Sequence, residues 1–310
     1  MPSAIEVRGL VKEYGPVVAV RGITFSVTEG SVFAFLGPNG AGKTTTTEIL
    51  EGLRRASQGE VRVLDRDPWT EGRALHFETG VIPQDFHFFE KITAREAVEY
   101  YSALFHVRPK VDDLLSRVAL SDKTDARFDT LSGGQKQKLG LALALVNDPR
   151  ICFLDEPTTG LDPHARRAIW EVIRKLREEG RTVFLTTHYL EEAQLLADRV
   201  AIIHRGRIIA EGSPGEIIQA HGGPERLVVA GGPAVVEFFR RHEGLAPTTR
   251  DGQVEIPIRS KEEGLGYLDA LRSSGIPWGG FTVERDTLED VFVRLVGRMD
   301  DGVLKSEGEA

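Results

Sequence analysis

The stretch VFAFLGPNGAGKT at residues 32–44 decides the fold, because it joins an apolar strand, a glycine-rich loop and the start of a helix. Residues 37–44 match the pattern G-x-x-x-x-G-K-[ST]. In this pattern, glycines let backbone N–H groups surround phosphate oxygens, and the helix N-terminus favours negative charge. Lys43 is placed to reach the β and γ phosphates, and the Thr44 hydroxyl to ligate Mg²⁺. The stretch therefore predicts a nucleotide phosphate site, against the alternative of a glycine-rich turn with an exposed lysine.

The rest of the first two thirds of the chain has the pattern of an α/β fold. Apolar runs without alternation recur at residues 151–154, 182–185 and 200–203, and helical patterns at 165–179 and 191–197 separate them. Strands that are apolar throughout are typical of a parallel sheet that is covered on both faces. We therefore predict a mostly parallel sheet.

Two further features surround this predicted sheet. Residues 5–8 and 23–27 alternate between apolar and polar, which predicts an antiparallel N-terminal β subdomain. Between residues 48 and 127 the pattern is irregular and more helical, and Thr93-Ala94-Arg95-Glu96 has the form of a capping box. We expect an inserted helical lobe at about residues 86–140.

A pair of carboxylates follows the apolar run at residues 151–154. Asp155 and Glu156 end this strand abruptly, and ligands of open α/β sheets bind at the carboxyl ends of strands. Asp155 is placed to hold Mg²⁺, and Glu156 to polarise an attacking water as a general base. Such a pair alone is more often the start of a solvated loop, but the phosphate loop favours the functional interpretation.

A second anion site is predicted at Leu131-Ser132-Gly133-Gly134-Gln135, which precedes a helical pattern. Ser132 lies near the N-cap, and the amides of Gly133 and Gly134 are free donors. An ordinary N-cap with flexible glycines is the alternative. A chain that binds one nucleotide needs only one phosphate cradle, so the second one needs an explanation.

These motifs resemble those of the ATP-binding subunits of ABC transporters, over about residues 4–215. The resemblance extends to Gln84, to the loop Gly160-Leu161-Asp162 and to a histidine at position 188, all in the family's order. Tyr14 stands where the family stacks an aromatic ring on adenine, and a surface tyrosine is the alternative there. The resemblance implies a head-to-tail homodimer, in which each ATP lies between the phosphate loop of one chain and the loop at residues 131–135 of its partner, called the signature loop. This arrangement explains why one chain carries a second anion site.

The resemblance implies ATP and Mg²⁺ as cofactors and assigns a role to each motif residue. ATP binding is implied for Tyr14, Gly37, Asn39, Gly40, Ala41, Gly42, Lys43, Thr44, Thr45 and Gln84. Catalysis is implied for Glu156, His188 and Lys43, and the metal site for Thr44, Gln84 and Asp155. Contacts to the partner's ATP are implied for Ser132, Gly133, Gly134 and Gln135, and a dimer contact for Asp162.

A second, smaller domain is expected after the first. The ATP-binding domain is assigned to residues 1–215, a linker to 216–226, an α+β domain to 227–298 and a disordered tail to 299–310. The α+β pattern is βαββαβ, with a hairpin about Asp251-Gly252 and a last helix at 287–296. Residues 286–292 resemble the C-terminal extension of daunorubicin-resistance-type exporter subunits, and the simpler interpretation is that Leu288, Val291, Phe292 and Leu295 form the apolar face of a helix.

Composition limits the partners. The 310 residues carry a net charge of −8, which argues against nucleic acid as a partner, and a single Cys152 cannot form an internal disulfide. The longest run without charged residues, 30–42, is too short to span a bilayer, and the N-terminus lacks a secretory pattern. We therefore expect a cytoplasmic protein, peripheral on the cytoplasmic face of the plasma membrane, that powers export through a separate multi-span permease.

The permease is expected to dock near residues 84–105, where Phe86, Phe88 and Phe89 are either apolar anchors or local core. Two other functions are weighed against export. A soluble ABC ATPase that remodels nucleic acid or ribosomes disagrees with the acidic charge and the absence of long coiled coils. A P-loop kinase would leave the motif at 131–135 without a purpose.

Overall fold

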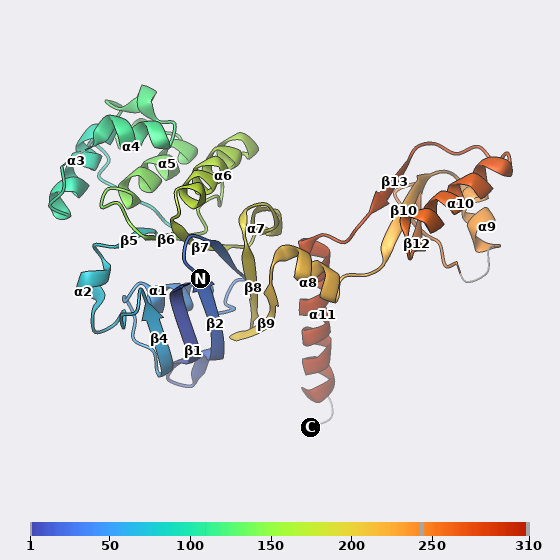
Figure 1. The fold of residues 1–310 in the computed structure, drawn as a ribbon, viewed down its shortest axis with the longest axis horizontal. Helices are drawn as coiled ribbons and strands as arrows, with labels where there is room; N and C mark the ends of the chain where they lie inside the picture. The colour runs from blue at the N-terminus through green and yellow to red at the C-terminus, as the bar shows by residue number, and fades with distance from the viewer. Residues whose placement is uncertain (1, 109, 242–244, 308–310) are drawn as a thin grey trace. The chain divides into compact units, whose positions relative to one another are not determined.

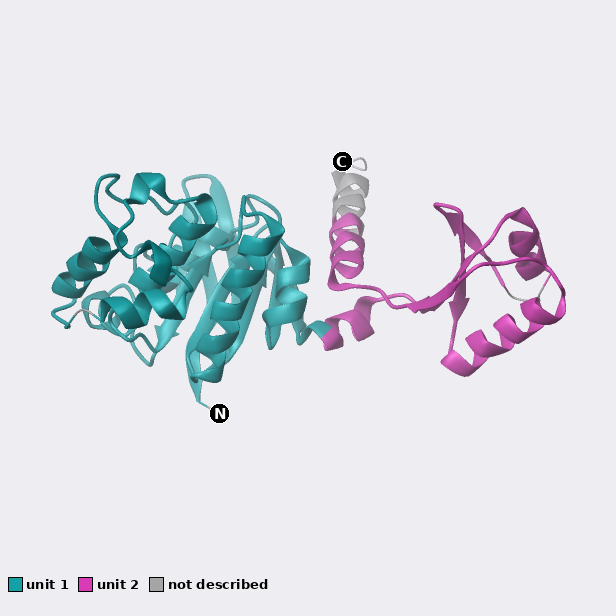
Figure 2. Ribbon diagram, turned by 90° about the horizontal axis from the view of Figure 1, so that it is seen from above, with its two compact units in different colours: residues 1–214 teal, residues 215–310 magenta. Residues whose placement is uncertain are grey.

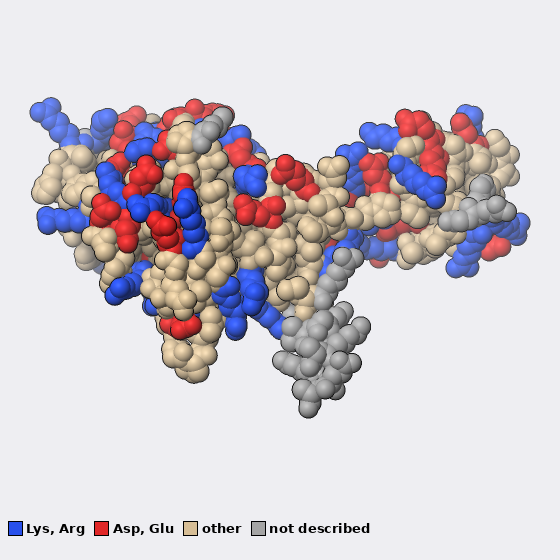
Figure 3. All heavy atoms as spheres, turned by 60° about the horizontal axis from the view of Figure 1, so that its bottom comes forward, with Lys and Arg blue, Asp and Glu red and all other residues tan. Residues whose placement is uncertain are grey.

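The computed structural model describes residues 2–108, 110–241 and 245–307. The chain divides into two compact units, unit 1 at residues 1–214 and unit 2 at residues 215–310 (Figure 2). None of the described helices combines the length and the apolar character needed to cross a bilayer. On the face shown in Figure 3, acidic and basic side chains lie close together over unit 1, and exposed ion pairs such as Lys91 with Asp129 and Arg95 with Asp125 show the same mixing.

A six-stranded sheet forms the centre of unit 1 (Figure 1). Its strands are β3 (Val32–Leu36), β5 (Thr79–Ile82), β6 (Ile151–Asp155), β7 (Thr182–Thr187), β8 (Arg199–His204) and β9 (Arg207–Gly212). Their order in space is β5-β6-β7-β3-β8-β9, and all neighbours are parallel except β8 and β9. Strands β3, β6 and β7 are buried along their whole length, which confirms the parallel sheet expected from their apolar runs.

The expected antiparallel subdomain is also present in unit 1. It consists of β1 (Ser3–Tyr14), β2 (Val17–Thr28) and β4 (Gln58–Val63), in the order β2-β1-β4. Phe25 of β2 stacks on Phe33 of β3 at 5.4 Å between ring centroids and faces Phe184 of β7 at 6.2 Å. These aromatic contacts join the two sheets into one apolar core.

The helices of unit 1 frame the sheets and form a lobe (Figure 1). They are α1 (Lys43–Leu50), α2 (Gly72–Leu75), α3 (Ala94–Leu104), α4 (Val111–Arg117), η1 (Ser121–Lys123), η2 (Phe128–Thr130), α5 (Gly133–Ala144), α6 (Pro163–Glu178) and α7 (Leu190–Leu196). Helices α3, α4 and α5 pack on one another in the lobe. Thr93 with Glu96 and Ser132 with Gln135 form complete capping boxes at the starts of α3 and α5, as the sequence predicts for Thr93.

The segment between residues 48 and 127 is less helical than its pattern suggests, because it also contains β4 and β5. Both strands are short, and both are held by partners that lie far away in the sequence. Val61 of β4 pairs with Val7 of β1, and Val81 of β5 pairs with Phe153 of β6. Long-range pairing of this kind leaves little signal in a local window of sequence.

Unit 2 has the predicted βαββαβ order. Its elements there are β10 (Glu225–Ala230), α9 (Pro233–Arg240), β11 (Thr248–Arg250), β12 (Gln253–Ile258), α10 (Lys261–Ser273) and β13 (Phe281–Glu284). The sheet is antiparallel throughout, with the order β11-β12-β10-β13, which is the ferredoxin-like arrangement. Leu227, Val254, Phe239 and Leu271 are buried together, so the two helices and the sheet share one core.

Two helices of unit 2 differ from the expected linker and tail. The range 216–226 contains most of α8 (Pro214–His221), in which Ile217 is buried. The last helix, α11 (Leu288–Glu307), continues past residue 299, because no proline interrupts it. Residues 308–310 of the expected tail lie outside the described residues.

Candidate functional site

The phosphate loop lies between β3 and α1, as predicted. A Cβ atom at Gly37 would lie 2.3 Å from the carbonyl oxygen of Ile203 on β8, so the loop passes too close to the sheet for any side chain. Gly42 has φ 110°, and a Cβ there would lie 2.7 Å from the carbonyl oxygen of Ala19. Glycine is required at both positions, and the loop is thereby pressed against the ends of the strands.

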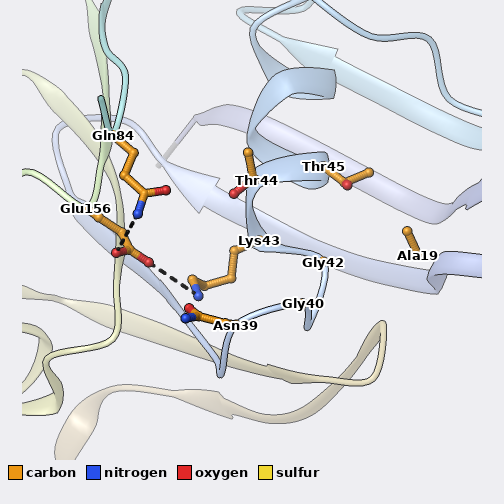
Figure 4. A pocket seen from close by; sticks show the side chains of 9 residues that line it. All are labelled: Ala19, Asn39, Gly40, Gly42, Lys43, Thr44, Thr45, Gln84 and Glu156. Carbon is orange, nitrogen blue, oxygen red and sulfur yellow. Dashed lines mark hydrogen bonds and ion pairs between the residues drawn. The ribbon is translucent and has the colours of Figure 1, made fainter. Parts of the chain in front are cut away.

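A cavity of about 360 Å³ opens in front of this loop (Figure 4). It is lined by Ala19, Asn39, Gly40, Gly42, Lys43, Thr44, Thr45, Gln84 and Glu156. The Nζ atom of Lys43 donates to the carbonyl oxygen of Gly37 at 2.8 Å, which holds the ammonium group inside the loop. Exposed backbone amides, a buried ammonium group and a helix N-terminus make this cavity suited to phosphate groups.

Glu156 is the most connected side chain of the site, and it is only 6% exposed. Its carboxylate lies 3.5 Å from the Nζ of Lys43 and accepts hydrogen bonds from Gln84 at 3.3 Å and Thr159 at 3.1 Å. The Nδ1 atom of His188 lies 3.0 Å from the same carboxylate. Residues from the phosphate loop, from the segment after β5 and from the ends of β6 and β7 therefore meet at one carboxylate.

The register of two parallel strands fixes Glu156 and Asp155. Asp155 of β6 pairs with Thr186 of β7. The backbone N–H of Glu156 donates to the carbonyl oxygen of Thr186 at 3.0 Å, and the Thr186 hydroxyl donates to the carboxylate of Asp155. Glu156 has φ 46°, a left-handed conformation that costs a non-glycine residue energy and that turns its side chain at the strand end.

The donors around Asp155 fit the Mg²⁺ expected at this site. Burial raises the pKa of Asp155, as do the nearby carboxylates of Glu156 and Glu48, while Thr186 and Lys43 lower it. A divalent cation next to Asp155 would relieve this repulsion. Magnesium is usually held by one or two carboxylates together with substrate phosphates, and in the described part of the chain no group of three acidic, histidine or cysteine side chains is arranged to hold a metal ion by itself.

The predicted site residues fall into two groups. Asn39, Gly40, Gly42, Lys43, Thr44, Thr45, Gln84 and Glu156 line the cavity, and Gly37, Ala41, Asp155 and His188 belong to the loop and the strand ends beside it. Tyr14, Ser132, Gly133, Gly134, Gln135 and Asp162 do not line it. The ring of Tyr14 instead lies between two cations, with Lys12 at 5.1 Å and Arg54 at 5.2 Å from its centroid.

The signature loop is shaped by its contacts with α6. The Ser132 hydroxyl accepts from the backbone N–H of Gln135, and the side chain of Gln135 accepts from the backbone N–H of Ser132. A Cβ atom at Gly134 would lie 2.8 Å from the Cβ of Ala165 on α6, so glycine lets the two helices approach each other. Asp162 caps α6 by accepting from the N–H groups of residues 164 and 165, and these hydrogen bonds lower its pKa.

Three contributors to the site stand outside the motifs of the sequence. Thr186 bonds the carboxylate of Asp155, Thr159 bonds that of Glu156, and Ala19 lines the cavity. A signal existed for Thr186, since it lies near the carboxyl end of a buried run beside the one that ends in Asp155, and the carboxyl ends of parallel strands meet. No local signal marks Thr159 or Ala19.

Comparison with known proteins identifies the family. Residues 20–159 match the family described as ABC transporter. The chain is 38% identical over 311 residues to Nod factor export ATP-binding protein I of Rhizobium sp. (strain N33), which covers 95% of this chain and 97% of that protein. It is 37% identical over 312 residues to daunorubicin resistance ATP-binding protein DrrA3 of Streptomyces coeruleorubidus, with 98% of both chains covered.

Solved structures agree with this assignment. The structure of cbiO1 from Clostridium perfringens, part of the ABC transporter complex cbiONQ, has a TM-score of 0.65 at 28% identity and covers 71% of this chain and 92% of that one. A structure described as an ATP binding subunit of an ABC transporter has a TM-score of 0.63 at 26% identity, covering 70% and 92%. The chain belongs to the ABC transporter family, as an ATP-binding subunit whose ATPase activity is coupled to transport.

Proposed function

We propose that the chain hydrolyses MgATP as a head-to-tail homodimer and drives export through a separate membrane-spanning permease. One observation supports the homodimer. The signature loop, Ser132 to Gln135, presents N-terminal helix amides, yet it does not line the cavity that holds Lys43 and Glu156. Each chain therefore offers one half of two sites, and a second copy in reversed orientation supplies the missing donors.

The residues around the cavity divide the chemistry among them. Lys43 and the loop amides bind the β and γ phosphates, and Glu156 takes the proton of the attacking water as general base. Gln84 and His188, which both contact Glu156, place that carboxylate relative to the γ phosphate. Mg²⁺, when bound by Thr44, Gln84 and Asp155, supplies charge neutralisation on the phosphates. Tyr14 is proposed to stack on adenine, and Asp162 to contact the partner's site.

The names of two relatives, a Nod factor export ATP-binding protein and a daunorubicin resistance ATP-binding protein, support export as the function. These names favour a transport function over the remodelling of nucleic acid or ribosomes. The transport pathway then belongs to a permease, and we place this chain against it, on the cytoplasmic face of the membrane.

The helical lobe offers a surface for the permease. Phe86 and Phe88 pack against the core of unit 1, so they are not free anchors. Phe89 is 62% exposed, and its ring lies 6.1 Å from that of Tyr100, which is followed one turn later by the exposed Leu104. Phe89, Tyr100 and Leu104 form an apolar docking patch suited to a permease segment.

The homodimer is tested with Glu156→Gln, which binds ATP but lacks the general base. In the presence of ATP and Mg²⁺, light scattering is expected to give twice the mass of the 34.2 kDa chain, and the mass of one chain without nucleotide. A second substitution, Ser132→Arg, is expected to abolish this dimer, whereas Ser121→Arg, on another exposed serine of the same lobe, leaves it intact. A single-chain mass with saturating ATP contradicts the proposal.

The permease is tested by detergent pull-down of the tagged chain from its native membranes. A polypeptide with several apolar segments of about 20 residues is expected to co-purify with the wild-type chain. Phe89→Asp is expected to lose this partner and to keep ATP-dependent dimerisation in the Glu156→Gln background. Val17→Asp, on an exposed apolar residue of β2, serves as the matched control. Co-purification of ribosomes or nucleic acid instead would overturn the transport assignment.

A further inference from the structure

A buried carboxyl group behind the site takes no part in the chemistry described above. Glu192 lies on α7, directly after the segment that carries His188, and it is fully buried. Its Oε1 atom accepts a hydrogen bond from the Nε1–H of Trp170 on α6 at 2.8 Å. An apolar side chain of similar size would fill this place without the cost of desolvating a carboxyl group. Packing alone therefore does not account for Glu192.

The other side of this carboxyl faces the two segments that meet at Glu156. Burial raises the pKa of Glu192, while the hydroxyls of Thr187 and Thr158, the Trp170 indole and the charge of Arg166 lower it. Thr187 directly precedes His188, and Thr158 belongs to the loop that leads to Asp162. Among the described residues, the Oε2 atom of Glu192 and the Oγ1 atom of Thr158 reach no hydrogen-bond partner of normal geometry. The cluster is thus polar, buried and only partly satisfied.

A second contact from α6 reaches the histidine through Tyr189. The guanidinium group of Arg166 lies 4.1 Å above the ring of Tyr189, and this ring lies 4.2 Å from the imidazole of His188. The backbone N–H of Tyr189 donates to the Thr187 hydroxyl at 3.0 Å. The two residues that flank His188 are therefore both tied into the cluster.

Helix α6 connects this cluster to the loop expected at the dimer interface. Asp162 caps α6, Arg166 stands one turn later and Trp170 one further turn along. Residues spaced by four lie on one face of a helix, so Asp162, Arg166 and Trp170 move together if α6 moves. Helices transmit such displacements as rigid elements.

We propose that Glu192 is a positioning residue, which through Trp170 and the Arg166–Tyr189 stack sets His188 against Glu156 and couples this position to the Asp162 loop at the start of α6. The coupling to the partner's site rests on the proposed homodimer, whereas the positioning of His188 concerns one chain alone. The carboxyl is retained because it accepts from the Trp170 indole on α6 and lies close to the hydroxyls of Thr187 and Thr158, which an apolar side chain cannot serve.

The test measures steady-state ATPase activity of the full chain in three variants of Glu192 and Trp170. Glu192→Leu is expected to lower kcat about tenfold with the KM for ATP within about twofold, because it misplaces His188 without touching the nucleotide. Glu192→Gln keeps an acceptor for Trp170 and a donor for Thr158, so it is expected to stay within about threefold of wild type. Trp170→Phe, which removes the indole donor together with part of the buried ring, is expected to lower kcat severalfold.

Glu191→Leu is the matched control, since Glu191 is exposed on the same helix and is expected to change neither constant. Thermal unfolding separates the outcomes. If Glu192→Leu unfolds at a lower temperature but keeps the wild-type kcat per folded chain, Glu192 is only structural and the proposal is wrong. Equal losses in Glu192→Gln and Glu192→Leu would also overturn it, because the hydrogen bonds would then not be the cause.

The dimer assay distinguishes failure of the positioning role of Glu192 from failure of the proposed function. If Glu156→Gln forms the ATP-bound dimer while Glu192→Leu has normal kcat, only the positioning role fails. Glu156→Gln combined with Glu192→Leu is expected to form the dimer at a several-fold higher ATP concentration, because the Asp162 loop is loosened. An unchanged ATP dependence of the double variant would contradict the coupling to the partner's site while leaving the homodimer in place.

Discussion

A buried carboxylate with charged partners is found in each unit of this protein. Glu156 in unit 1 is 6% exposed and Asp286 in unit 2 is 4% exposed. Asp286 accepts hydrogen bonds from the backbone N–H of Gly223 at 2.6 Å and from Arg294 at 2.7 Å, and Arg226 lies 3.1 Å from its other oxygen. The two groups are equally buried, but their surroundings differ in kind.

Two arginines and a backbone amide surround Asp286. Burial would raise the pKa of Asp286. The hydrogen bond from Gly223 and the charges of Arg294 and Arg226 outweigh this effect, so its pKa lies below the ordinary value. Glu156 shares one lysine with a neighbouring carboxylate, stands in a left-handed conformation and borders a cavity. The comparison teaches that the carboxylate of unit 2 is enclosed by dedicated partners, whereas the one that we propose as general base is held by groups that also line the cavity.

The largest expected difference between the two carboxylates is in their effect on ATPase activity. Glu156→Gln is expected to lower kcat by at least about a hundredfold, because the amide cannot accept the proton of the attacking water. The free energy of unfolding is expected to change by less than about 1 kcal/mol, since the amide keeps the shape of the side chain. Glu171→Gln, on an exposed glutamate of α6, controls for the substitution in both phosphate release and urea unfolding. A kcat within tenfold of wild type would contradict the proposed role of Glu156 as general base, and with it the contrast to Asp286.

The opposite result is expected in unit 2. Asp286→Asn leaves two arginines without their carboxylate and is expected to lower the free energy of unfolding of this unit by about 3 kcal/mol, with kcat within about twofold. Hydrogen exchange of residues 225–230 is the measurement, and Asp269→Asn, on an exposed aspartate, is the control.

The pH dependence of this difference follows from the lowered pKa. The stabilisation by Asp286 is present in full above its unfolded value of 3.8 and is lost as the pH falls through the folded pKa. Wild type and Asp286→Asn are therefore expected to converge only below about pH 3.8. Convergence at neutral pH would show that the arginines do not hold this carboxylate.

A smaller effect tests the shared partners of Glu156. Thr159→Val removes one hydroxyl donor and keeps the size of the side chain, and is expected to lower kcat about threefold through misplacement of the carboxylate. Thr130→Val, on another exposed threonine of unit 1, is expected to leave kcat unchanged. A loss as large as that of Glu156→Gln would mean that Thr159 itself takes part in the chemistry.

The smallest effect concerns a third carboxyl that faces carboxylates and not cations. Burial raises the pKa of Glu51 to about 8, and Asp155 and Glu48 contribute to the rise. A raised folded pKa gives stability that is complete below the unfolded value of 4.5 and lost as the pH rises through 8. Glu51→Gln is therefore expected to be more stable than wild type at pH 9, and not at pH 5. Urea unfolding in magnesium-free buffer measures this, with the exposed Glu60→Gln as control.

Much of the fold was predictable because its signals are local. The glycine-rich loop, the capping box at Thr93 and the apolar run at residues 32–36 each depend on neighbouring residues only. The hairpin about Asp251-Gly252 is predicted for the same reason, since both residues stand in the left-handed conformation that such turns require. Strands β4 and β5 were missed because their partners lie elsewhere in the chain.

The residues of the candidate site divide in the same way, into those marked by a local motif and those placed by contacts with distant segments. Lys43, Asp155 and Glu156 stand in motifs with one physical explanation, so their types and spacing predicted their places. Thr186 and Glu192 carry no motif, because a threonine at a strand end or a glutamate in a short helix is ordinary in sequence. Their importance comes from the atoms that surround them.

The sequence by itself determined that this chain has a phosphate loop, a pair of carboxylates at a strand end and a second helix N-terminus with free amides. These features follow from the geometry of a few consecutive residues and need no distant partner. Only the tertiary structure decided that four segments meet at Glu156 and that Glu192 is buried against Trp170 of α6. The register of parallel strands and the packing of α6 on α7 set these contacts, and both join residues that are far apart in the chain.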